Sequence, residues 1–384
     1  GHGRLDPILR DPNVEDISCD GYSIPVFLYH EDYDNIRTNV EYEQEELDSF
    51  IISLAQEAGK NISLEKPQVS GTLNDGSRVE LTYGSDVTQR GSTYTIRKFA
   101  EDPFTPIDLI ETGTFSLDQM AYLWLAIENK KSLIFAGGTA SGKTTSMNAV
   151  SMFIPPDSKI ISIEDTPEIN LHQENWIPSV TREGPGIETE LDMYSLLRSG
   201  LRQRPEYIIV GEVRGEEALT LFQAMNTGHT TYSTLHAESI QTAIRRLENP
   251  PIDVPRAMFE GLDIISVQIL TQVEGKRVRR TNSMVEIEGL DDRTEDLNFL
   301  EIFDWNAASD QITQTANSSI LEEIAEERGV TMNRIRRELR NRQKVLEYLR
   351  ANNIRYYEDF TAVIHKYYRN PEMVLDRIGD MQVA

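Results

Sequence analysis

The sequence predicts an α/β protein with a small first domain, a larger domain built on parallel strands, and a helical C-terminal region. Three observations in the 384 residues support this fold class. Turn signals and β-branched residues alternate in the first hundred residues. Short apolar strands then alternate with helical segments from Ser132 to Gly228. After about residue 305, the remaining long segments show helical periodicity.

The first domain is expected at residues 4–99. Apolar residues recur at helical spacing between Leu47 and Ala55, which predicts a helix. An Asn-Asp-Gly turn signal at 74–76 is followed by alternating apolar residues, a pattern typical of a β-hairpin. The stretch STYTIRKF at 92–99 has the β-branched and aromatic content of a further strand.

The second domain is expected at residues 114–305. The segment 100–113 before it contains two prolines and no strong periodicity, so we expect an interdomain linker there. The strands SLIFAG, KIISIED and EYIIVGE are separated by helical segments, which indicates parallel strands with helices on both faces. The strands are expected to stop near residue 305, and residues 306–384 are predicted to be helical.

A glycine-rich loop between an apolar strand and a helix indicates phosphate binding. The stretch GGTASGKTT satisfies the pattern G-x-x-x-x-G-K-[ST]. Its glycines let backbone N–H groups turn towards phosphates, and the helix N-terminus adds positive potential. Lys143 is expected to neutralise the β- and γ-phosphates, and the Thr144 hydroxyl to ligate Mg²⁺. The loop residues expected to bind the nucleotide are Gly137, Gly138, Thr139, Ala140, Ser141, Gly142, Lys143, Thr144 and Thr145.

Carboxylates follow two of the apolar strands. Glu164, Asp165 and Glu168 come at the end of the second strand, and Glu212 comes at the end of the third. A doubly wound sheet binds its ligand at the carboxyl ends of its strands, so we expect these groups to face Mg²⁺ and the attacking water. Solvated loop carboxylates are the alternative in so acidic a chain.

The segment NTGHTTYSTLHA places His229 and His236 in a Gly- and Thr-rich stretch. Glycine and consecutive threonines argue against a helix, so we expect a loop. A zinc pair would need a third ligand, and the sequence offers no obvious one. The segment can sense the γ-phosphate, join neighbouring subunits, or hold two packed and inert histidines.

The charge balance is strongly acidic. With 63 acidic and 38 basic residues, the formal net charge is -25. Such a field repels nucleic acid and anionic lipid over most of the surface. Because the acids are spread along the whole chain, we expect a protein adapted to high salt, with an ordinary acidic cytoplasmic protein as the alternative. The single cysteine excludes a disulfide framework, and no apolar run approaches the length of a membrane helix.

Four motifs together resemble the secretion-type hexameric ATPases, which drive type II secretion, type IV pilus assembly and assembly of the archaeal motility filament. GGTASGKTT resembles their Walker A loop, ISIEDTPE their aspartate box, PEYIIVGEVRGEEA their Walker B motif, and NTGHTTYSTLHA their histidine box. The resemblance implies a RecA-like motor domain after a smaller PAS-like domain, a homohexameric ring, and ATP-Mg²⁺ between domains. It also implies a cytoplasmic protein at the inner face of the membrane, where it acts on a membrane platform protein.

The resemblance assigns roles by position. Glu168 is expected to be the catalytic glutamate, with Glu164 and Asp165 as supporting acids, and Glu212 the Walker B acid that holds Mg²⁺ with Thr144. Bacterial members often carry a four-cysteine zinc module, which a chain with one cysteine cannot form. An archaeal-type member is therefore expected.

Several arginines are candidates for contact with the phosphates. Arg198 and Arg202 share one helical face and can reach a neighbouring subunit's nucleotide, and Arg214 follows Glu212. The resemblance suggests that the first domain closes over the phosphates, which makes Arg90 and Arg97 candidates as well. Surface ion pairs are the alternative for each arginine.

Two other functions compete with an assembly motor. A DNA-translocating ATPase of the conjugation or packaging type would use KRVRR at 276–280 and the arginines of 333–344 as basic contacts. Solvated arginines are the alternative there, and the acidic net charge favours it. A nucleotide-binding switch that does not cycle is the third possibility, although the guanine-specifying N-K-x-D pattern is absent from the sequence.

Overall fold

The computed structural model describes residues 2–30, 33–99, 102–182, 191–291 and 293–382. The chain divides into two compact units, Gly1–Glu101 and Asp102–Ala384. Each unit has its own sheet and its own hydrophobic core. The division falls inside the expected linker 100–113, of which residues 100 and 101 lie outside the described residues.

The first unit is an antiparallel sheet with one long helix. Its six strands have the order β3-β2-β1-β6-β5-β4. Helix α2 buries Leu47, Ile51 and Leu54, because residues three and four apart share one helical face. The predicted hairpin is confirmed by the antiparallel pairing of β4 with β5. The elements in chain order are η1 (Gly3–Leu5), α1 (Asp6–Leu9), β1 (Val14–Cys19), β2 (Phe27–His30), β3 (Asp34–Arg37), α2 (Gln44–Glu57), β4 (Gln68–Thr72), β5 (Arg78–Thr82) and β6 (Thr93–Arg97).

The second unit is built on a nine-stranded mixed sheet with the order β15-β14-β13-β12-β7-β11-β10-β8-β9. The pairs from β12 to β9 are parallel, and those from β12 to β15 are antiparallel. Its elements are α3 (Pro106–Glu111), α4 (Leu117–Glu128), β7 (Leu133–Gly137), α5 (Lys143–Ser151), β8 (Ile160–Glu164), β9 (Trp176–Val180), α6 (Met193–Leu201), β10 (Tyr207–Val210), α7 (Glu217–Asn226), β11 (Thr230–His236), α8 (Ile240–Glu248), η2 (Arg256–Gly261), β12 (Ile264–Val273), β13 (Lys276–Leu290), β14 (Leu297–Asn306), β15 (Gln311–Gln314), α9 (Ser319–Glu327), α10 (Met332–Ala351), α11 (Tyr357–Arg369) and α12 (Pro371–Gln382).

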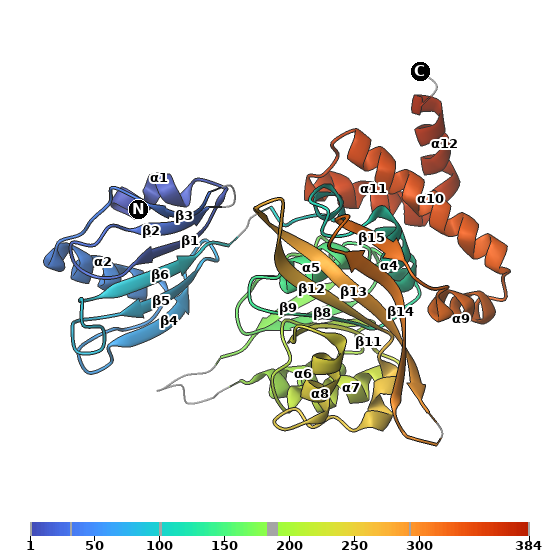
Figure 1. Cartoon of the computed structure of the whole chain (residues 1–384). Helices are drawn as coiled ribbons and strands as arrows, with labels where there is room; N and C mark the ends of the chain where they lie inside the picture. The colour runs from blue at the N-terminus through green and yellow to red at the C-terminus, as the bar shows by residue number, and fades with distance from the viewer. Residues whose placement is uncertain (1, 31–32, 100–101, 183–190, 292, 383–384) are drawn as a thin grey trace. The chain divides into compact units, whose positions relative to one another are not determined.

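Helices cover both faces of this sheet (Figure 1). One hydrophobic core joins one face to α3, α4, α5 and the C-terminal helices, and a second core joins the other face to α6, α7 and α8. Along β7, Leu133 and Phe135 belong to the first core and Ile134 and Ala136 to the second, because successive side chains point to opposite faces. The α/β class that the sequence predicts is confirmed.

Two expectations about the chain's course are wrong. The segment expected as a linker contains α3, which a capping box between Thr105 and Asp108 begins and whose apolar side chains are buried. Strands also continue past residue 305, because the Asn306 side chain accepts two backbone hydrogen bonds and turns the chain into β15. That strand is polar and largely exposed at the sheet edge, so its sequence carries little apolar signal.

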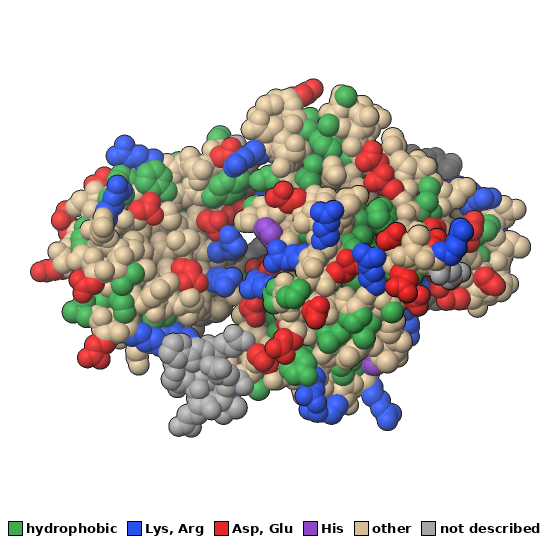
Figure 2. Space-filling model, turned by 60° about the horizontal axis from the view of Figure 1, so that its bottom comes forward, with side chains coloured by type: hydrophobic (Ala, Val, Ile, Leu, Met, Phe, Trp, Pro, Cys, Tyr) green, Lys and Arg blue, Asp and Glu red, His purple; other side chains and the backbone are tan. Residues whose placement is uncertain are grey.

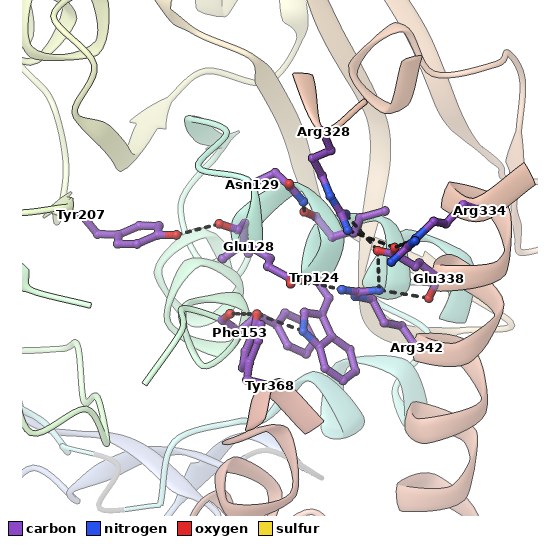
Figure 3. Close-up of polar contacts among 12 residues, drawn as sticks. Trp124, Glu128, Asn129, Phe153, Tyr207, Arg328, Arg334, Glu338, Arg342 and Tyr368 are labelled. Carbon is purple, nitrogen blue, oxygen red and sulfur yellow. Dashed lines mark hydrogen bonds and ion pairs between the residues drawn. The ribbon is translucent and has the colours of Figure 1, made fainter. Parts of the chain in front are cut away.

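The C-terminal helices pack on α4 through a buried arginine (Figure 3). The Arg342 guanidinium, on α10, forms an ion pair with Glu128 and lies 5.4 Å from the ring centre of Trp124. The Trp124 indole N–H donates to the Tyr368 hydroxyl at 3.0 Å, and that hydroxyl donates to the backbone oxygen of Phe153. The helical region is therefore fixed both to α4 and to the chain just after α5.

Charged side chains of both signs are interspersed over the face that Figure 2 presents, rather than gathered in one acidic tail. This distribution agrees with the spread of acids along the sequence. Among the residues that the structure describes, none of the helices combines the length and the apolar character needed to cross a bilayer.

Candidate active site

The phosphate loop joins β7 to α5 with backbone geometry that only some residues accept. A Cβ added to Gly137 would lie 2.4 Å from both the Gln268 backbone oxygen and the Ser141 Oγ, so a side chain has no room there. Gly142, directly before α5, has a φ of +86°, which favours glycine. Ala140 also holds a positive φ, of +59°. The loop predicted from the sequence thus has a strained backbone, a feature that clusters at ligand sites.

Lys143 lies over this loop as the first residue of α5. Its Nζ donates to the Gly138 backbone oxygen at 2.7 Å, and the Ser141 hydroxyl donates to the same oxygen at 2.9 Å. Burial lowers the pKa of Lys143, while the negative charges of Glu212 and Glu168 oppose that shift. The structure therefore brings one lysine and two of the predicted carboxylates into a single electrostatic site. Thr144 and Thr145 follow in the first turn of α5, while Thr139 is exposed in the loop.

Glu164 is a support beneath the site rather than a group at its surface. Its side chain is buried and accepts the backbone N–H groups of Glu168 at 2.9 Å and Ile169 at 3.0 Å. Burial raises the pKa of Glu164 to about 7. The carboxyl group thus fixes the backbone from which the exposed Glu168 side chain projects.

Arg214 forms ion pairs with two further predicted carboxylates, Asp165 and Glu212. Its guanidinium lies 3.3 Å from an Asp165 oxygen and 2.6 Å from a Glu212 oxygen. The residue before Glu212, Gly211, donates its backbone N–H to the Ile163 oxygen at 2.9 Å, which keeps the ends of β8 and β10 together. Asp165 and Glu212 therefore lie together at the carboxyl ends of β8 and β10, where the Arg214 guanidinium pairs with both.

The two histidines flank a strand, β11: His236 is its last residue and so does not lie in a loop, whereas His229 lies just before it. His236 pairs in register with Gly137 and so lies beside the phosphate loop. His229 precedes the start of β11, near Lys130 and Glu206 at the amino edge of the sheet. Because seven residues of strand span about 23 Å, both side chains cannot act at the same phosphate of one chain. Successive β-branched threonines form this buried strand.

The candidate arginines are dispersed. Arg198 stacks its guanidinium 5.4 Å from the Tyr194 ring centre, and Arg202 ends α6. The next residue, Gln203, accepts a hydrogen bond from Lys159 just before β8, so Arg202 lies at the amino edge, away from its own phosphate loop. In the first unit, Arg97 pairs with Asp16 at 3.1 Å, and Arg90 is exposed.

Two neighbours of the loop, one of them a hydrogen-bond partner, were not predicted. Arg279, on β13, donates its Nε–H to the Ala140 oxygen at 3.0 Å. A Glu238 oxygen lies 3.2 Å from the position of a Cβ on Gly138. The segment KRVRR contains Arg279, but the loop residue that this arginine contacts, Ala140, is 139 positions away in the sequence.

Known proteins place this site in a family. A family model described as "Type II/IV secretion system protein" matches residues 72–354. The uncharacterized protein MJ0900 of Methanocaldococcus jannaschii is 40% identical over 96% of this chain and 68% of its own length. Conjugal transfer protein TrbB of Rhizobium radiobacter is 33% identical over 59% of this chain and 69% of its own.

The solved structure of the pilus retraction motor PilT with bound ADP is similar in fold. It gives a TM-score of 0.54 over 90% of this chain and 92% of that chain, at 19% identity. The resemblance carried by the four motifs is confirmed by the match of the family model and by the 40% identity with MJ0900. This chain belongs to the type II/IV secretion system protein family.

Proposed function

We propose that this chain hydrolyses ATP with Mg²⁺ and works as a homohexameric ring motor for a type IV pilus-like filament or a secretion machine. The observation that carries the proposal is the geometry of the phosphate loop, where Lys143 Nζ bonds to the Gly138 oxygen and Ala140 and Gly142 hold positive φ values; the charges of Glu168 and Glu212 also act on Lys143. A lysine that interacts electrostatically with two carboxylates, at the carboxyl ends of parallel strands, is suited to phosphoryl transfer.

The residues present fit a nucleotide and its metal. The absence of room for a Cβ at Gly137 and the left-handed backbone at Gly142 suit a loop whose N–H groups wrap phosphates. Lys143 would hold the phosphates, and Thr144 and Glu212 would hold Mg²⁺, which neutralises phosphate charge when bound. Glu168 would orient the attacking water and accept its proton, from a backbone that Glu164 fixes.

The ring, the platform protein and the place at the inner face of the membrane rest on family membership. The printed names of its relatives refer to conjugal transfer and pilus retraction, and a motor for assembly or secretion fits that range. The arginines at the amino edge would serve a neighbouring subunit in such a ring, and Arg90 and Arg97 would meet the nucleotide from the first unit.

A DNA-translocating ATPase is the second candidate, favoured by the likeness to a conjugal transfer protein. Two of the arginines proposed as its basic contacts, Arg280 and Arg342, are buried and so are not exposed to DNA. Filter binding of duplex DNA at two salt concentrations tests it, because binding through phosphates weakens steeply as salt rises. Tight, salt-sensitive binding would favour this candidate over a filament motor.

Two substitutions test the ATPase directly. Lys143→Ala should abolish hydrolysis and weaken nucleotide binding. Glu168→Gln should keep ATP binding and lose about 10²–10⁴-fold in turnover, the contribution expected of a group that moves a proton. Lys276→Ala, an exposed cation of the same unit, is the matched control. Normal turnover in Lys143→Ala, or full activity in Glu168→Gln beside an inactive Glu164→Gln, would contradict these assignments.

A further inference from the structure

Arg279 reaches the phosphate loop from the antiparallel part of the sheet. Its Nε–H donates to the Ala140 oxygen at 3.0 Å, and its Cδ lies 3.1 Å from the position of a Cβ on Gly142. The arginine stem therefore lies against the two loop residues that hold positive φ values, +59° and +86°. A left-handed alanine is costly, so a contact that holds Ala140 has a direct physical use.

The strand register brings Arg279 to the level of the loop. β7 ends at Gly137, which pairs with Gln268 of β12. That strand continues past this level, and its Leu270, two residues further, pairs with Arg279 of β13. The side chain is thus carried by regular strand pairing, and not by an exposed turn.

The neighbouring Arg280 fixes the strand at this point. Its guanidinium forms two hydrogen bonds to Asp310, at 2.7 and 2.8 Å, and lies almost wholly buried. One of its nitrogens also donates to the backbone oxygens of Thr112 and Arg279, each at 2.8 Å. Because the Arg279 backbone is held in this way, its side chain presents the Nε donor from a fixed base.

We propose that Arg279 is a positioning residue for the nucleotide, which holds Ala140–Gly142 in the conformation that directs backbone N–H groups at phosphates. This inference rests on the proposed ATP-binding function. Without the contact, the loop would hold that conformation for a smaller fraction of the time. Apparent nucleotide affinity falls in proportion to that fraction, whereas turnover of the bound nucleotide is unchanged.

Three substitutions at this position separate the hydrogen bond from the charge. Arg279→Ala removes both. Arg279→Gln places an amide N–H donor at the same number of bonds from the backbone as the arginine Nε, without the charge. Arg279→Lys keeps the charge and moves the donor. The exposed Lys276 begins the same strand, so Lys276→Ala is the control for loss of a cation.

The test is titration of the full chain with Mg-ADP by calorimetry, together with steady-state ATP hydrolysis. Arg279→Ala should bind Mg-ADP about tenfold more weakly and raise the KM for ATP by a similar factor, as for loss of one hydrogen bond. Its kcat should stay within about twofold of the parent protein's. Arg279→Gln and Lys276→Ala should bind Mg-ADP as the parent protein does.

Parental affinity in Arg279→Ala, measured beside a weakened Lys143→Ala, would overturn the inference. Rescue by lysine and not by glutamine would also overturn it, because the charge and not the bond to Ala140 would then be responsible. If the parent protein itself fails to bind Mg-ADP, the proposed function fails instead, so the two failures are distinguishable.

Discussion

Replacement of Arg342 by alanine tests whether the C-terminal helices are an integral part of the second unit. The arginine side chain is only 3% exposed and lies beside two aromatic rings, 5.4 Å from the centre of Trp124 and 5.5 Å from that of Tyr367. It forms an ion pair with Glu128 and donates to the Glu338 backbone oxygen at 3.1 Å (Figure 3). These contacts join α10 to α4.

The expected loss of stability is large because one partner of a buried pair would remain. The side chain of Glu128 is 30% exposed, so water can compensate only part of its charge. Breaking a buried ion pair from one side costs about 3–5 kcal/mol. By contrast, Arg334 lies on the same helix, is 57% exposed and pairs with Glu338 at 3.4 Å, so Arg334→Ala should cost about 0–1 kcal/mol.

Urea unfolding followed by tryptophan fluorescence measures the difference. All three tryptophans, Trp124, Trp176 and Trp305, belong to the second unit, so the signal reports on that unit. Arg342→Met with Glu128→Gln should recover much of the stability lost in Arg342→Ala, because methionine fills the space and position 128 no longer carries an unpaired charge. A loss in Arg342→Ala within about 1 kcal/mol of that in Arg334→Ala would refute the reasoning.

Three further predictions concern pH, salt and the ring. Because burial raises the pKa of Glu164 to about 7 from an unfolded value of 4.5, the unfolded chain releases this proton first as pH rises, and stability should fall by about 3 kcal/mol between those values. Glu164→Gln should flatten that fall in urea unfolding at pH 5 and pH 7.5, and an unchanged pH dependence would contradict the assignment. With a net charge of -25, rings should assemble poorly at low ionic strength, and sedimentation showing equal assembly at low and molar salt would refute salt adaptation. If Arg198 or Arg202 acts across an interface, mixing its alanine variant with Lys143→Ala subunits should restore activity that neither parent has, and inactive mixed rings would count against it.

The phosphate loop and its carboxylates could be predicted because their signals are local. Glycines, a lysine and a hydroxyl within nine residues define the loop, and the ends of parallel strands meet by a general rule. The roles of buried side chains could not be predicted in the same way. Nothing in the spacing of Glu164 and Glu168 shows that one carboxyl is buried and bonded to the backbone of the other.

The remaining wrong or missing predictions also concern features that no local sequence pattern shows. Helix α3 has six residues, too few to show a periodic pattern, and β15 is a polar edge strand. The contact between Arg279 and Ala140 joins residues 139 positions apart, so it depends on sheet pairing that no local pattern contains. Threonines that argued against a helix in the histidine segment proved to build a strand.

The attachment of the C-terminal helices to both α4 and the end of α5 matters for anyone who wishes to dissect the protein. A fragment ending at residue 305 would lose β15 and α9–α12, and the aromatic side chains of Trp124 and Phe153 would face water. Large exposed apolar patches promote aggregation, so such a fragment should precipitate or fold poorly. Any exchange of ATPase modules between relatives would therefore have to carry the helices along with the sheet that they cover.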